Sequence, residues 1–261
     1  METLLVLDVG NTNTSVGLYR GERLLGAWRI GTDNRCTADE FGLKLQMLLS
    51  TLPTSEEVTA SVISCVVPPL LNMLVRAVEQ YFQVTPLIVG PGIKTGIPIR
   101  YEDPRALGAD RIANAVAAVD TYQSPVIIVD LGTATTLSVI DDQGQYLGGA
   151  IAPGVMTGAN ALFAVASRLP QVEMVWPDTL VQRNTTLSMQ AGILYGNAAM
   201  VDGLIERAKR ELDLPFQVVI TGGLSHLIAE HLSTAHHVHP HLTLAGLRLL
   251  WGRNQQRSHT P

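Results

Sequence analysis

Lysine is scarce in this chain. Among the 18 basic residues of the 261-residue sequence, the lysines are Lys44, Lys94 and Lys209. None of them completes a G-x-x-x-x-G-K-[ST] run, so the sequence has no P-loop to cradle nucleotide phosphates. A G-x-G-x-x-G run after a strand is also missing, which disfavours a dinucleotide-binding fold. If the protein handles nucleotides, it must hold them by another device.

Cysteine and charge are low as well. Cys36 and Cys65 are the two cysteines and lie far apart in the sequence, which excludes a disulfide framework and a C-x-x-C metal site. Charged residues make up 16% of the chain, and 23 acidic residues outnumber the 18 basic ones. This balance argues against a dedicated nucleic-acid or membrane partner, because such proteins carry a basic patch.

The first ten residues, METLLVLDVG, have no basic segment, and their short apolar run meets an aspartate at Asp8. This pattern is not typical of a signal peptide or a membrane span. With 46% hydrophobic residues the chain is also too apolar for extensive disorder. We therefore expect a folded protein of the cytoplasm.

An internal repeat is the most informative feature of the sequence. The segment VIIVDLGTATTLSVIDDQGQYLGGAIAPG, from Val126, matches LLVLDVGNTNTSVGLYRGERLLGAWRI, from Leu4, with Asp130 on Asp8. Each copy predicts three strands with an Asp-x-Gly turn after the first. The repeat predicts two α/β domains of like topology. We expect them at residues 1–122 and 123–253, with a polar tail at 254–261.

Helical periodicity and caps place the other elements. T-A-D-E from Thr37 is a capping box with Glu40 at its third position, and it predicts a helix there. Apolar spacing predicts further helices at 69–82, 109–122, 155–167, 186–212 and 242–251. Apolar runs predict strands at 58–64, 87–89 and 216–220.

The turn after the first strand has the composition of an anion-binding loop. Gly10 lets the backbone approach a phosphate, and its neighbours offer neutral donors. Asp8 could hold Mg²⁺ by way of water. A plain Asx-type hairpin turn would use the same residues. The second copy, after Asp130, favours a functional reading, because two such turns facing one cleft make a phosphate clamp of the kind found in actin-like phosphotransferases.

Three other features carry residues capable of chemistry. Asp110, in the first turn of the 109–122 helix, is either a helix-capping acid or a proton acceptor. Thr221-Gly222-Gly223 follows an apolar strand and could admit a base or ribose, although many strand–helix turns carry such glycines. The histidines at 231, 236, 237, 239 and 241 do not predict a metal site, since no cysteine joins them and strand alternation divides them between faces.

Together these motifs resemble the type III pantothenate kinase family. D-V-G-N-T, G-I-K-T-G-I-P-I-R-Y, G-A-D-R-I-A-N-A-V-A-A, I-V-D-L-G-T-A-T-T and a late T-G-G occur in family order from about Leu4 to Trp251. The resemblance implies two ribonuclease-H-like domains of the actin and sugar-kinase superfamily. It also implies transfer of the γ-phosphoryl group of ATP to pantothenate, the first step of coenzyme A biosynthesis. It further implies a divalent metal such as Mg²⁺, a monovalent cation that is either potassium or ammonium, and a homodimer.

The resemblance also assigns roles to individual residues. Asp110 would be the catalytic proton acceptor, Asp130 would bind the monovalent cation, and Asp8 would lie near the divalent metal. ATP would be bound by Thr133 and by the first loop: Asp8, Val9, Gly10, Asn11, Thr12, Asn13, Thr14 and Ser15. Pantothenate would be bound by Tyr101, Gly108, Ala109, Asp110, Arg111 and Thr185.

Two alternatives stay open at this stage. A non-catalytic accessory or regulatory relative would share the fold, but the presence of Asp8, Asp110 and Asp130 speaks against it. A sister phosphotransferase acting on another small hydroxyl or carboxyl substrate is disfavoured by the G-A-D-R helix.

Overall fold

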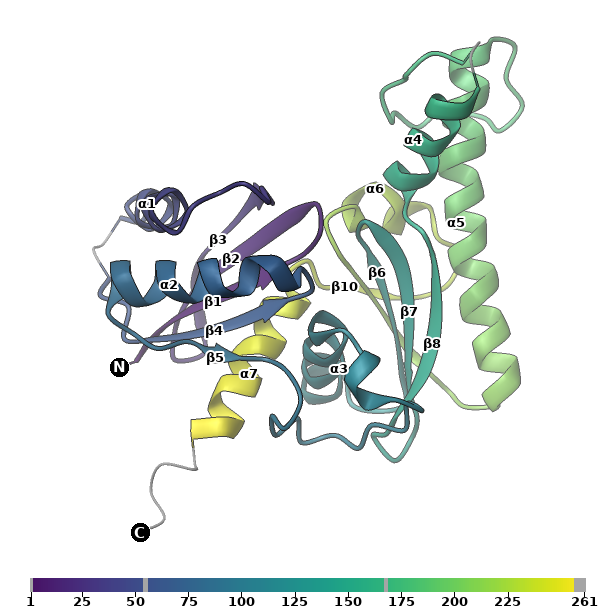
Figure 1. The fold of residues 1–261 in the computed structure, drawn as a ribbon. Coiled ribbons are helices and arrows are strands. Elements are labelled where there is room, and N and C mark those ends of the chain that lie inside the picture. The colour runs from purple at the N-terminus through teal and green to yellow at the C-terminus, as the bar shows by residue number, and fades with distance from the viewer. Residues whose placement is uncertain (1, 54–55, 167–168, 256–261) are drawn as a thin grey trace. The chain divides into compact units, whose positions relative to one another are not determined.

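The computed structural model describes residues 2–53, 56–166 and 169–255 (Figure 1). The chain forms two compact units. Unit 1 comprises residues 2–117 together with 241–255, and unit 2 comprises residues 118–240. The division expected from the sequence, by contrast, assigned the last helix to the C-terminal half.

Unit 1 contains a mixed sheet with the strand order β3-β2-β1-β4-β5. The β1–β2 and β2–β3 pairs are antiparallel, whereas β4 is parallel to β1 and β5 is parallel to β4. The strands are β1 (Thr3–Val9), β2 (Asn13–Arg20), β3 (Arg23–Gly31), β4 (Ala60–Cys65) and β5 (Leu87–Ile88).

Unit 2 repeats this arrangement, with the order β10-β9-β6-β7-β8. Strand β6 pairs antiparallel with β7 and parallel with β9, as β1 does with β2 and β4. The two sheets confirm the duplication inferred from the repeat. The strands are β6 (Val126–Leu131), β7 (Ala134–Ile140), β8 (Tyr146–Pro153), β9 (Gln217–Thr221) and the unexpected β10 (His237–Val238).

Helices α1 (Ala38–Leu49) and α2 (Leu71–Phe82) pack against each other in unit 1. The predicted capping box is present: Thr37 accepts from the Glu40 amide, and the Glu40 carboxylate accepts from the Thr37 amide. Helix α3 has its predicted bounds, Ala109–Tyr122. The core includes Leu5, Leu7, Leu18, Phe41, Leu45, Ile63 and Leu74.

Unit 2 contains α4 (Val155–Val165), the long α5 (Thr185–Leu212) and the short α6 (Ser225–Ile228). A segment from 169 to 184 connects α4 to α5, and Trp176 anchors it. The Trp176 indole N–H donates to the Leu227 carbonyl at 2.6 Å, and its ring stacks on His231. Short 3₁₀ turns occur at Pro68–Leu70, Pro104–Ala106 and Ala229–His231.

Helix α7 (Leu242–Gln255) belongs to unit 1, where it packs on β1, β2 and β4. It is longer than the predicted helix 242–251, so residues 254 and 255 of the expected tail are helical. The rest of that tail, like residue 167 of the predicted 155–167 helix, lies outside the described residues. Within the described residues, no helix has the length and apolarity needed to cross a membrane.

Candidate functional site

The first loop is a tight turn closed from outside by one threonine. The Gly10 amide donates to the Asn13 carbonyl at 3.0 Å. Thr32, just after β3, donates its hydroxyl to the Gly10 carbonyl at 2.8 Å and its amide to the Thr12 carbonyl at 3.0 Å. Since the Thr32 hydroxyl has one hydrogen, Thr14 must donate in the 3.0 Å contact between the two hydroxyls. The loop carbonyls are therefore tied to β3.

Asp8 lies next to this loop at the carboxyl end of the central strand β1. It is half-buried, opposite Ser15 on β2 and Ser64 on β4. Burial raises the pKa of the neighbouring Cys65 thiol, and the charge of Asp8 raises it further. Asp8 thus brings negative charge to the strand ends where ligands gather in open α/β sheets.

The head of α3 holds a largely covered carboxylate. Asp110 accepts a hydrogen bond from the Arg111 amide at 2.8 Å, and its Oδ1 curls back so far that a Cβ on Gly108 would overlap it. Burial raises the pKa of Asp110 above its ordinary value, although Arg111 opposes this. A carboxylate whose pKa is raised by desolvation is a candidate for proton transfer.

Arg111 and Tyr101 form the side of this carboxylate site. The Arg111 guanidinium lies 5.9 Å from the centre of the Tyr101 ring, and Arg111 is buried. A buried arginine is suited to recognise a carboxylate or phosphate group. The structure thus brings together the predicted residues Tyr101, Gly108, Asp110 and Arg111.

Val66 connects the α3 head to the first strand. The Val66 amide donates to the Val9 carbonyl at 3.0 Å. On its other side, Val66 Cγ1 lies 3.8 Å from the point that a Cβ on Gly108 would occupy. Asp110 is therefore held near the ends of β1 and β4, at the edge where Asp8 lies.

The second turn, in unit 2, has a different glycine environment. Asp130 is half-buried on β6, opposite Thr136 and Thr221. Gly222 has φ +93°, and a Cβ there would overlap Asp130 Oδ1 and lie 2.6 Å from the Leu131 nitrogen. The predicted Thr221-Gly222-Gly223 turn is thus pressed against the carboxylate expected to bind a cation.

Thr133 is at the tip of the second turn and is exposed. Its carbonyl accepts from the Gly154 amide at 3.2 Å and from the Thr157 hydroxyl at 2.6 Å. A Cβ on Gly154 would overlap the carbonyls of Gly132 and Thr133. The start of α4 therefore holds the second turn, as Thr32 holds the first.

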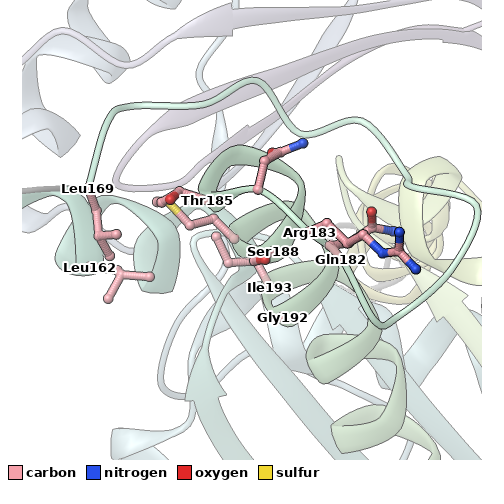
Figure 2. A pocket seen from close by; sticks show the side chains of 10 residues that line it. Leu162, Leu169, Gln182, Arg183, Thr185, Ser188, Gly192 and Ile193 are labelled. Atoms are coloured by element: carbon pink, nitrogen blue, oxygen red, sulfur yellow. The ribbon is translucent and has the colours of Figure 1, made fainter.

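Thr185 lies apart from Asp130 in unit 2, in the first turn of α5. Asn184 caps this helix by accepting from the Leu187 amide at 2.9 Å. Figure 2 shows the cavity of about 680 Å³ that Thr185 lines with Arg183, Ser188 and other residues of α4, α5 and their connection. The cavity is large enough for a small-molecule ligand.

The duplication extends to the hydroxyl groups of Ser64, which no sequence motif includes, and of Thr221 in the predicted turn. Ser64 on β4 and Thr221 on β9 occupy the same register beside Asp8 and Asp130. In the described part of the chain, both hydroxyls are buried and have no hydrogen-bond partner. Extending the repeat alignment to the fourth strand of each sheet would have found this pair. Thr32 and Gly154 carry no such signal, because each acts through a contact remote in sequence.

The donor chemistry fits the expected ions. Mg²⁺ prefers oxygen ligands and is usually held by one or two carboxylates together with substrate phosphates. Asp8 supplies such a carboxylate near the end of the central strand of its sheet. Among the described residues, no cluster of three or more His, Cys, Asp or Glu side chains forms an all-protein metal cage.

Two duplicated sheets, each with an aspartate near the end of its central strand and a glycine turn after it, define a protein of the actin and sugar-kinase fold. Solved structures agree on the fold. The activator of 2-hydroxyisocaproyl-CoA dehydratase from Clostridium difficile has a TM-score of 0.56 at 11% identity, covering 99% of this chain and 98% of its own. The inorganic polyphosphate/ATP-glucomannokinase from Arthrobacter sp. strain KM has a TM-score of 0.50 at 12% identity, covering 98% and 100%.

The chain belongs to the type III pantothenate kinase family, whose model matches residues 4–207. The type III pantothenate kinase of Geobacillus thermodenitrificans is 49% identical over 97% of this chain and 99% of its own. That of Myxococcus xanthus is 48% identical over 96% and 98%.

Proposed function

We propose that this protein transfers the γ-phosphoryl group of ATP to the primary hydroxyl of pantothenate, giving 4'-phosphopantothenate for coenzyme A synthesis. Family membership over nearly the whole chain supports the reaction. The largely covered carboxylate of Asp110, beside the buried Arg111, is the structural observation that carries it. Catalysis of phosphoryl transfer depends mainly on positioning the substrates and neutralising charge. In this site Asp110 could position the hydroxyl and Arg111 could neutralise negative charge.

In this proposal Asp110 orients the pantothenate hydroxyl and accepts its proton. Its carboxylate is fixed by the Arg111 amide, so it does not need to reorganise during the reaction. Arg111, stacked against Tyr101, pairs with the pantothenate carboxylate or with the phosphoryl group in transfer. Gly108 and Ala109 supply backbone at the helix head, where the macrodipole favours negative charge.

ATP phosphates are proposed to bind the backbone and hydroxyls of residues 8–15 together with Thr133. The ties from Thr32 and Gly154 support this, because a loop held in advance loses little entropy when it binds an anion. A divalent metal, which the kinase reaction requires, neutralises phosphate charge when bound. Asp8 is the carboxylate proposed to hold it by way of water.

Asp130 is proposed to bind a monovalent cation, potassium or ammonium. The Asp130 carboxylate is half-buried and in close contact with the Gly222 backbone. A bound cation would stabilise the ionised form of such a carboxylate. Thr185 is proposed as a further pantothenate contact, supported by its place in the cavity wall. The ATP substrate supports a cytoplasmic location.

A homodimer is also proposed. Apolar side chains are exposed on α4 and on the connection before α5, with Val165 82% and Val181 85% exposed. Such side chains favour a covered surface. Sedimentation should find a dimer that Val181→Asp weakens; a stable, fully active wild-type monomer would refute it.

A coupled assay with ATP and pantothenate tests the function. We expect ADP release that depends on pantothenate, and product that carries the phosphate on the primary hydroxyl. Acetate, sugars and polyphosphate serve as matched alternative substrates. Turnover of one of these instead of pantothenate would indicate a sister phosphotransferase, and no turnover with any would indicate an accessory protein.

A further inference from the structure

The last turn of α7 is hydrogen-bonded to the glycine-rich loop at residues 90–101, which precedes the α3 head. Asn254 accepts from the Lys94 amide at 3.0 Å and donates to the Lys94 carbonyl at 3.1 Å. Its remaining amide hydrogen goes to the Leu250 carbonyl at 2.8 Å, which fixes the side chain in one orientation. Arg253 donates to the Thr95 carbonyl. Two adjacent residues of α7 thus bind two adjacent loop residues that lie 160 and 158 positions away in the sequence.

The conformation of the loop leaves room for the Arg253 side chain at Gly96. Gly96 has φ +72°, and a Cβ there would lie 2.8 Å from Arg253 Nη1, so the arginine occupies space that a side chain would need. The Thr95 hydroxyl donates to the Ile97 carbonyl at 2.9 Å, closing the loop on itself. The loop then runs to Tyr101, which packs under Arg111.

The same helix is locked to α3. Gly246 lies against the Ala113 backbone so closely that a Cβ would overlap the Ala113 carbonyl oxygen. Three residues earlier, the Thr243 hydroxyl donates to the Asn114 side chain at 2.8 Å. One end of α7 therefore packs on the helix that carries Asp110, and the other end holds the loop.

We propose that Arg253 and Asn254 are positioning residues for pantothenate. By joining the loop to α3 through a rigid helix, they set the position of Tyr101, at the end of the loop, relative to the Asp110 carboxylate. A long loop that contains Gly90, Gly92 and Gly96 would otherwise be mobile. This inference rests on the proposed function, because the loop leads to Tyr101, a residue expected to bind pantothenate.

Steady-state kinetics on the full-length enzyme test the proposal, with Asn254→Ala, Arg253→Ala and Arg253→Lys. Losing the loop hydrogen bonds of either Arg253 or Asn254 should raise the KM for pantothenate by roughly tenfold. The KM for ATP and the melting temperature should change little. Arg253→Lys, which keeps a donor for the Thr95 carbonyl, should recover most of the loss. Gln255→Ala, an exposed neighbour in the same turn, is the matched control.

Hydrogen exchange without substrates gives a readout that does not depend on activity. The Lys94 amide and the loop around it should exchange faster in Asn254→Ala than in Gln255→Ala. An active wild-type enzyme whose variants keep the normal KM for pantothenate would overturn this inference alone. Equal rises in both KM values together with a lower melting temperature would also overturn it, since they indicate general destabilisation. A wild-type protein that does not phosphorylate pantothenate would overturn the proposed function and this inference with it.

Discussion

Gly222 and Asp130 are in such close contact that nothing larger than a hydrogen fits on the Gly222 α-carbon. The site of a Cβ overlaps Asp130 Oδ1 and lies 2.6 Å from the Leu131 nitrogen, and φ at Gly222 is +93°. The turn that could admit a base or ribose is therefore in direct contact with the carboxylate proposed to bind a cation. A change in either is expected to affect both ligands.

Gly222→Ala should lower both stability and ATP affinity. The positive φ and the overlap should cost at least about 1–3 kcal/mol. Thermal melting measures the first effect and titration calorimetry the second. Gly203→Ala is the matched control, because Gly203 lies in α5 with open space around its α-carbon. The control should gain about 0.5–1 kcal/mol. A Gly222→Ala protein as stable as the wild type would contradict the packing described here.

Asp110→Asn should keep ATP binding and lose turnover by about 10²–10⁴-fold, the usual contribution of general acid–base catalysis. Because burial raises the pKa of Asp110, the acidic limb of the rate profile should lie above the ordinary carboxyl range. The profile of kcat/KM against pH reports this directly. Near-normal turnover in the variant would rule out Asp110 as the base.

The same burial has an effect on stability. The pKa of Asp110 is higher in the folded state than in the unfolded state, so ionisation of this carboxyl opposes folding. The protonated carboxyl therefore makes its full contribution to the free energy of unfolding below the unfolded-state pKa. That contribution is lost as pH rises through the folded pKa. Asp110→Asn should therefore melt at a higher temperature than the wild type near neutral pH. The difference should disappear in acid, and a variant less stable at neutral pH would refute the sign.

Turnover should rise when potassium or ammonium replaces sodium at constant ionic strength. Asp130 offers a carboxylate suited to a large, weakly hydrated cation. Initial rates in the three chloride salts test this, and Asp130→Ala should abolish the response. Equal wild-type rates in the three salts would refute the monovalent site.

Thr32→Val should weaken ATP binding without disrupting the sheet. It removes the hydroxyl that holds the Gly10 carbonyl and accepts from Thr14. Losing these bonds should lower ATP affinity by about tenfold. Thr32→Ser keeps the hydroxyl and should bind ATP almost normally. Calorimetry with both variants decides, and equal affinity in the two would show that the hydroxyl does not order the loop.

Much of the fold was predictable because its signals are local or repeated. The capping box at Thr37, the bounds of α3 and both strand triplets follow from short-range patterns. Strand β10 was missed because two residues carry no periodicity. The placement of α7 in unit 1 was missed because packing between the ends of a chain leaves no pattern in either end.

The site was predictable to a different extent. Tyr101, Gly108 and Arg111 come together around Asp110 as the motif suggested. The residues that hold the loops in place were not found, since Thr32 and Asn254 are single polar residues whose partners are remote in sequence. Tertiary packing determines which polar groups distant in sequence come into contact, and a single sequence carries no pattern that reveals such pairs.

The discontinuity of unit 1 has a consequence for synthesis. A ribosome makes residues 118–240 before residues 241–255, so unit 1 lacks α7 throughout the synthesis of unit 2. Arg253 and Asn254 are made after every strand of both sheets, so the loop at Lys94 and Thr95 lacks its hydrogen bonds to α7 until then. A chain interrupted between residues 241 and 252 would contain both sheets, Asp8, Asp110 and Asp130, and yet leave that loop without these bonds.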